Sequence, residues 1–181
     1  MEANEAGELQ EHAEHGAHEP SMRPVAFTMS VLAVLVAITT VLGHRTHTEA
    51  VLTQNKATDQ WNLYQAKKIR SNDTELVAGL LSVMQVTDAK GAEKLAKAYA
   101  DHQEKWKEDL VEEQEKAKQL EEKVEQAEAR ANRFDLGEAL LEIALVVSSI
   151  TLLTKNRLYW LLGLGFGVLG IISSASVLLL K

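Results

Sequence analysis

Two long uncharged stretches bracket a charged middle segment of the chain. Residues 25–43 contain no charged side chain in 19 positions, and residues 158–180 contain none in 23. A helix of 19 residues is roughly 28 Å long, close to the ~30 Å hydrocarbon core of a bilayer. A third apolar stretch, residues 136–153, is weaker because it contains two glutamates. The pattern predicts an all-α membrane protein with transmembrane helices at 25–43, 139–154 and 158–180.

The middle segment, residues 44–138, holds 15 basic and 19 acidic side chains. Glycines punctuate it at nearly equal spacing: Gly43 ends the first apolar stretch, Gly91 lies in a turn-like sequence at 87–91, and Gly137 precedes the second stretch. Each arm between these glycines would be roughly 65 Å long as a helix. The spacing predicts a long antiparallel helical hairpin outside the membrane, similar to a coiled coil, with its turn near 87–91.

The returning arm carries a heptad pattern, because its apolar positions alternate in steps of three and four. The residues that define this seam are Trp106, Leu110, Leu120, Val124 and Phe134, with Ala117, Ala127 and Ala131 between them and Glu113 as the polar member. Upstream, the pattern continues through Tyr99, His102, Trp106 and Leu110 with two successive steps of four, which predicts a local stutter.

The outgoing arm is less regular. Four of its residues are predicted to lie on one side, Ala57, Trp61, Tyr64 and Ile69, and a more apolar stretch follows with Leu76, Leu80 and Val83. Between these two groups, residues 71–74 and the following Glu75 favour a helix start, since Asn or Asp can cap a helix and a glutamate can complete a capping box. A continuous helix and a break near 71–74 are both compatible with the sequence.

Composition excludes several classes of protein. The chain has no cysteine, which excludes disulfide frameworks, thiol catalysis and cysteine-ligated zinc or iron-sulfur sites. The net charge is -7, and the lysines are scattered among glutamates, so the basic face needed to bind nucleic acid is missing. Residues 1–24 form an acidic tail with little to bury, so we expect disorder. The tail lacks the basic start of a signal peptide and is expected to remain attached.

The third apolar stretch contains a stripe of small residues. Gly163, Gly167, Gly170 and Ser174 follow in steps of four, three and four, which places them on one helix face. Small residues let helix backbones approach closely in lipid. We expect the stripe to pack against another helix, and no strand precedes these glycines as a nucleotide-binding loop would require.

Ionisable residues supply two further candidates. A carboxylate within a membrane span is a candidate for proton or cation handling, so Glu142 is open to that role or to a structural one near the interface. His12, His15 and His18 could gather a transition metal, although a repetitive Glu-His-Ala composition explains their spacing equally well. No nucleophile-base-acid motif and no phosphate loop are visible, so we predict no enzyme activity and no cofactor.

Membrane orientation follows from basic residues near the span ends. Arg23, Lys155 and Arg157 lie on one side, which places the tail and the short 154–157 turn in the cytoplasm and the arms outside. Other basic residues oppose this assignment, namely Arg45, Lys56, Arg130, Arg133 and Lys181.

The segment Trp61-Asn62-Leu63-Tyr64-Gln65-Ala66-Lys67-Lys68-Ile69, together with the layout of the chain, resembles a bacterial membrane protein family known as domain of unknown function 4337. The resemblance covers nearly the whole chain: acidic tail, one span, a long charged helical region and two closing spans. It implies a bacterial inner-membrane location and assigns no catalytic or binding residue.

Three functional hypotheses follow. The first is a non-enzymatic membrane scaffold that self-associates or serves as an accessory subunit, with the bilayer and another membrane protein or a second copy as partners. The second is a small oligomeric ion channel or transporter that uses Glu142. The third is a metal-responsive module that uses the N-terminal histidines.

Overall fold

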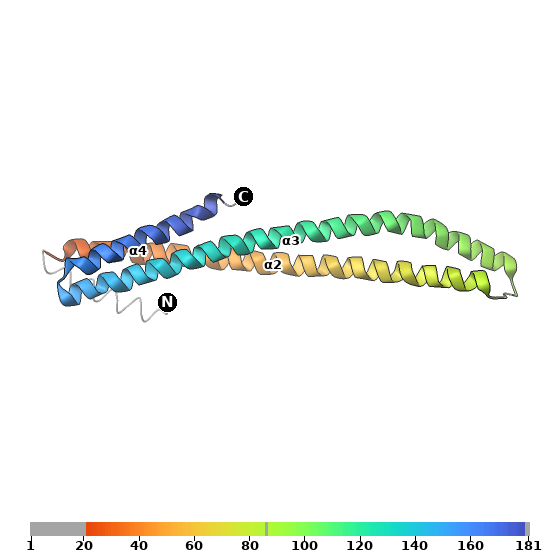
Figure 1. Ribbon diagram of the computed structural model, residues 1–181, viewed down its shortest axis with the longest axis horizontal. Helices are drawn as coiled ribbons and strands as arrows, with labels where there is room; N and C mark the ends of the chain where they lie inside the picture. Colours follow the sequence, from red (N-terminus) through yellow and green to blue (C-terminus); the bar gives the residue numbers. More distant parts are fainter. Residues whose placement is uncertain (1–20, 86, 180–181) are drawn as a thin grey trace. The chain divides into compact units, whose positions relative to one another are not determined.

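The computed structural model describes residues 21–85 and 87–179, and within these ranges all regular structure is helical. The order of elements is α2 (Arg23–Val83), α3 (Ala89–Thr154), α4 (Arg157–Ser176) and the short 3-10 helix η1 (Val177–Leu179), as Figure 1 shows. The predicted all-α class is confirmed. The predictions for the tail and its histidines concern residues outside the described ranges, apart from residues 21–24.

The helix boundaries have local causes. Pro24 lies in the first turn of α2, where its missing N–H costs no helical hydrogen bond. Asp88 caps α3, because its Oδ1 accepts a hydrogen bond from the backbone N–H of Gly91 at 3.0 Å. Asn156 caps α4 through its bond with the backbone N–H of Leu158. Lys155 has a positive φ of 55°, which lets the chain reverse between α3 and α4.

The two long helices continue through residues at which the sequence predicted a possible break or a turn. Helix α2 passes through residues 71–74 without a break, so of the two alternatives the structure has the continuous helix. The connection between α2 and α3 occupies residues 84–88, and Gly91 lies within the first turn of α3. Helix α3 ends at Thr154 and contains both the returning arm and the second apolar stretch.

The described chain forms two compact units, each treated by itself. The bundle unit contains residues 21–49 and 126–179, and the arm unit contains residues 50–125. Helices α2 and α3 contribute to both, whereas α4 belongs to the bundle unit alone.

The interior of the bundle unit is lined by small residues next to α4 and by apolar residues elsewhere. Its core includes Met29 and Leu32 from α2 and Leu141 and Leu145 from α3, all at most 4% exposed. Phe166 of α4 packs against this core. Each of α2, α3 and the α4–η1 segment contains a stretch that is long and apolar enough to cross a membrane.

The arm unit has a heptad seam on each helix. On α3 the less exposed positions run in alternating steps of three and four through Tyr99, Gln103, Trp106, Leu110, Glu113, Ala117, Leu120 and Val124. On α2 they run with the same steps through Ala50, Thr53, Ala57, Gln60, Tyr64, Lys67, Ser71, Thr74, Ala78 and Leu81. The seam of α2 is therefore made mainly of small and polar residues.

Two details of the predicted arms are wrong. His102 is exposed and Gln103 takes the seam position, so the heptad pattern continues without a stutter. On α2, Ala57 is buried and Trp61 and Tyr64 are partly buried, but Ile69 is 60% exposed and does not share their side. In the more apolar stretch that follows, Leu76, Leu80 and Val83 are 55% to 79% exposed. The reason is the α2 seam itself: small and hydroxyl residues fill it, and they leave the larger apolar side chains on other faces.

Candidate functional site

The most developed polar arrangement in the described chain joins the two helices of the arm unit. It is built around Glu113, which the α3 heptad places in the seam, where its side chain is 12% exposed. From α2, Gln60 and Lys67 reach the same carboxylate, and they lie seven residues apart and so on one helix face. We call these three residues the Glu113 cluster.

The contacts of the Glu113 cluster use both carboxylate oxygens. Lys67 Nζ donates to Glu113 Oε1 at 2.8 Å, and Gln60 Nε2 donates to Oε2. Gln60 Nε2 also lies 3.3 Å from the backbone oxygen of Glu113. Lys116, on the same helix, approaches Oε1 at 4.0 Å while pairing with Glu112 at 2.8 Å. The cluster therefore ties α2 to α3 through charge-assisted hydrogen bonds.

These donors favour the ionised form of the carboxyl. The hydrogen bond from Lys67, followed by the one from Gln60, lowers the pKa of Glu113 below its ordinary value, and burial opposes them only partly. The positive charges of Lys67 and Lys116 act in the same direction. Glu113 is thus held as an anion with each oxygen accepting a hydrogen bond from α2, which suits a structural role better than proton transfer.

Aromatic residues of the same α2 segment add a second link between the helices. Trp61 Nε1 donates to Glu121 Oε1 at 2.8 Å. The rings of Trp61 and Tyr64 meet edge to face with centroids 5.5 Å apart, and Lys68 Nζ lies 5.8 Å from the Tyr64 ring centroid. The two links together cover about two turns of each helix. Polar contacts inside a heptad seam specify register, because a slip by one heptad would leave them unpaired.

The bundle unit has its own polar contacts between α2 and α3. Thr40 Oγ1 donates to Glu138 Oε1 at 2.6 Å. His47 Nε2 lies 3.0 Å from both carboxylate oxygens of Asp135, with both side chains about half exposed. Glu142, the predicted ion-handling residue, is partly buried and interacts with another group.

The predicted glycine stripe of α4 lies against the chain's own helices. A Cβ on Gly163 would collide with Ser148 Oγ and lie 2.9 Å from the backbone oxygen of Ala144, both on α3. A Cβ on Gly170 would lie 2.9 Å from the backbone oxygen of Gly137, also on α3. These positions therefore have no room for any side chain.

The remaining members of the stripe differ in what they meet. At Gly167 a Cβ would come within 3.0 Å of Leu32 Cδ2 on α2. Ser174 is partly buried, and a Cβ on Gly137 would collide with its Oγ. By contrast, a Cβ on Gly165 would meet nothing within 4 Å.

Hydroxyl groups line the interior next to this stripe. Ser148 and Thr151 are fully buried, and their oxygens have no hydrogen-bond partner among the described residues, nor does that of Ser174. Ser173 Oγ, however, donates to the backbone oxygen of Arg133 at 3.0 Å. The α3–α4 contact is thus formed by small residues, among them serines with buried hydroxyls.

The other predicted seam residues also have defined positions. In the arm unit Trp106, Leu110 and Leu120 are partly buried and Val124 is 6% exposed. Phe134, in the bundle unit, is partly buried, and its Cβ lies 3.5 Å from the position of a Cβ on Gly43. No group of three or more potential metal ligands occurs in the part of the chain that the structure describes.

Three contacts of this site were not predicted from the sequence: those of Gln60 and Lys67 with Glu113, and that of Trp61 with Glu121. The signal was present for the first two, since they lie one heptad apart on α2. Both are polar, so they give no hydrophobic signal for the inner face of α2.

Residues 21–180 match the family model described as Domain of unknown function (DUF4337). The chain belongs to this family. No significant match to a curated protein or to a solved structure was found. In this DUF4337 chain, the Trp-Asn-Leu-Tyr-Gln-Ala-Lys segment that suggested the family supplies two residues, Trp61 and Lys67, that contact carboxylates of α3. The segment therefore helps to hold α2 against α3 in this chain.

Proposed function

We propose that this DUF4337 protein crosses a bacterial inner membrane three times and carries residues 44–138 as a helical hairpin in water. The observation that supports membrane insertion is the distribution of side-chain size in the bundle unit. Next to α4 the interior holds glycines and hydroxyl residues, which permit close helix packing in lipid, and elsewhere it holds an apolar core. Large apolar side chains lie outside, including Phe27, Val34, Ile38, Val41, Val146, Leu161, Val168, Leu169 and Ile172, all more than half exposed.

The arms serve, in this proposal, as the working part of a non-enzymatic scaffold or accessory subunit. Glu113, Lys67 and Gln60 hold the two helices in one register, which makes a rigid rod. Large apolar side chains of α2 remain exposed on this rod. Apolar patches that face water are typical of protein interaction sites. The protein therefore acts by binding, either to a second copy or to another membrane protein.

Purification from membranes in a mild detergent, followed by mass measurement, tests this function. An assembly larger than one chain, or a copurifying partner, is the expected result. A monomer without partners would contradict it. The orientation, with the arms on the periplasmic side, is tested separately by fusing at Gly91 a reporter enzyme that is active only in the periplasm.

A second candidate function is an ion path through the bundle unit. The observation in its favour is the presence of the buried hydroxyls of Ser148 and Thr151, which lack partners among the described residues, on the same helix as Glu142. Proton or cation flux into liposomes, compared between the wild type and Glu142→Gln, separates this candidate from the scaffold. The scaffold proposal predicts only background flux, equal in the wild type and the variant.

A further inference from the structure

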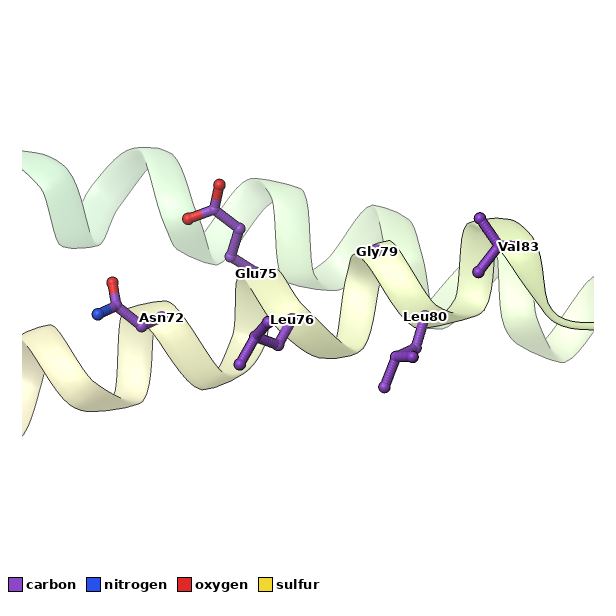
Figure 2. Close-up of a pocket in the computed structure, with 6 residues that line it drawn as sticks. All are labelled: Asn72, Glu75, Leu76, Gly79, Leu80 and Val83. Atoms are coloured by element: carbon purple, nitrogen blue, oxygen red, sulfur yellow. The ribbon is translucent and has the colours of Figure 1, made fainter.

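The apolar surface near the end of α2 is the feature that the arm's own packing does not use. Six side chains between residues 69 and 84 are 38% to 79% exposed: Ile69, Leu76, Val77, Leu80, Val83 and Met84. We call this surface the α2 outer face. Part of it is a shallow groove lined by Asn72, Glu75, Leu76, Gly79, Leu80 and Val83, and Figure 2 shows Leu76 and Leu80 projecting from the same side of α2.

The α2 outer face has a heptad pattern of its own. Ile69, Asp73, Leu76, Leu80 and Val83 follow in alternating steps of four and three. Each of the last four lies two residues beyond a position of the inner seam, namely Ser71, Thr74, Ala78 and Leu81. Two residues correspond to about 200° around a helix, so the two patterns lie on opposite sides of α2. One side faces α3, and the other can face a further helix.

Gly79 provides an independent observation. It lies inside a long helix, where glycine lowers stability relative to alanine. A Cβ at this position would meet nothing within 4 Å, so no packing within the chain requires glycine there. Without a side chain at Gly79, the groove between Asn72, Leu76 and Val83 has space for a side chain of a binding partner.

We infer that the α2 outer face binds the same face of a second copy, in parallel. This inference rests on the proposed membrane insertion, because copies in one membrane hold their arms at the same height and bring identical faces together at high effective concentration. The six side chains expose about 500 Å² of apolar surface at roughly 80 Å² each. Two copies would bury at most about 1,000 Å², which is the lower limit for a specific interface and less than the roughly 1,200–2,000 Å² of stable ones, so this dimer depends on the shared membrane for its effective concentration.

The parallel arrangement makes a distinctive prediction about charge. A two-fold axis along the face places each residue near its own copy, so Asp73 would face Asp73 of the second copy. Like charges at such a position oppose association. Asp73→Asn should therefore increase the dimer fraction several-fold at neutral pH, and the increase should shrink at high salt. An unchanged or lower dimer fraction would overturn the parallel register.

The absence of cysteine makes a direct test straightforward. Val83→Cys places one thiol on the α2 outer face, and Ser82→Cys places a matched exposed thiol on the same helical turn but off the face. Full-length protein in native membranes is oxidised, and disulfide-linked dimer is measured. About tenfold more dimer is expected for Val83→Cys, because a disulfide requires Cα atoms within roughly 7 Å. Equal yields for the two variants would overturn the inference.

A second variant checks the groove. Gly79→Gln fills the groove without adding apolar surface and replaces glycine with a better helix former. Combined with Val83→Cys, it should reduce dimer yield about tenfold while leaving helix content and thermal unfolding unchanged or improved. An undiminished yield would contradict the role of Gly79.

Two controls separate failure of this inference from failure of the proposed function. If alkaline carbonate extracts the protein from membranes, the proposed membrane insertion is wrong and the parallel dimer loses its basis. If the protein resists extraction but Val83→Cys links to a protein of different mass, the face binds another partner and the second-copy assignment is overturned.

Discussion

Replacing Glu113 with glutamine tests whether the Glu113 cluster holds the two helices of the arm together. The substitution keeps the shape of the side chain but removes its charge, so Lys67 at 2.8 Å loses its ionic partner. Gln60 would then face a second amide. Hydrogen bonds to charged groups contribute about 1.5–3 kcal/mol each. Because Lys67 is 31% exposed and can turn to water, solvent reduces this contribution, and we expect a loss of about 1–2 kcal/mol.

Hydrogen exchange of the full-length protein in detergent measures this loss where it occurs. A local destabilisation of about 1–2 kcal/mol corresponds to roughly 5- to 30-fold faster exchange in peptides containing Gln60 or Glu113. The matched control is Glu112→Gln. Glu112 is 66% exposed, and its ion pair among the described residues is with Lys116 on its own helix. Its removal should therefore change exchange by a factor of about two or less. Equal effects of the two substitutions would refute the reasoning.

The same cluster predicts a direction of pH dependence. The pKa of Glu113 is lowered from its ordinary value of 4.5, chiefly by the hydrogen bond from Lys67. A lowered carboxyl pKa stabilises the folded arm above that ordinary value, and this contribution is lost as the pH falls through the lowered pKa. Exchange near Glu113 should therefore accelerate on acidification in the wild type after correction for intrinsic rates. The Glu113→Gln protein should lack this component, and an identical pH profile in both proteins would contradict the assignment.

Three further predictions concern the bundle unit and the membrane. Gly163→Leu should destabilise the detergent-solubilised protein by about 1–3 kcal/mol through overpacking against α3. The control is Gly165→Leu, where a Cβ meets nothing within 4 Å, and it should leave thermal unfolding nearly unchanged. Equal melting temperatures for the two variants would contradict the packing. Wild type and Glu142→Gln should show the same background proton flux in liposomes, and a flux abolished by the substitution would support the ion path instead. A periplasm-specific reporter at Gly91 should be active, and an inactive but expressed fusion would place the arms in the cytoplasm.

The returning arm shows where sequence patterns succeed. Its apolar residues are sparse and regularly spaced in a background of Glu, Lys and Gln, so hydrophobicity alone indicates which face is buried. Val124 is 6% exposed, and the partly buried Leu110 and Leu120 continue the same face. Where the seam position is polar, as at Gln103, the pattern does not identify it, and the neighbouring His102 was assigned to the seam instead.

The outgoing arm shows why the rest could not be predicted. Its inner seam uses residues such as Thr53, Ala57 and Ser71, whose small size permits close approach of α3 but gives no hydrophobic signal. The strong apolar signal comes from Leu76 and Leu80, which lie on the other side of the helix. Heptad spacing alone is present in both sets, so only the packing against α3 distinguishes the inner face from the outer one.

The candidate site could be predicted from the sequence only in part. Glu113 stands out as a carboxylate within an apolar seam, and this already indicates a buried partner. Its partners depend on the alignment of α2 with α3, because a shift of one heptad would bring different side chains to it. The link from Trp61 to Glu121 depends on the same alignment. Chain reversal at residues 84–88 determines that alignment, and this position differs from the one that Gly91 suggested.

The mass of the native assembly tests the central claim most directly, namely that this DUF4337 protein acts as a membrane-bound scaffold. One chain has a mass of 20.0 kDa. Native mass spectrometry of the protein released from membranes in mild detergent should give a multiple of this mass, or one chain with a partner protein. A single chain without a partner, in a detergent at a concentration that leaves known membrane complexes intact, would contradict this claim.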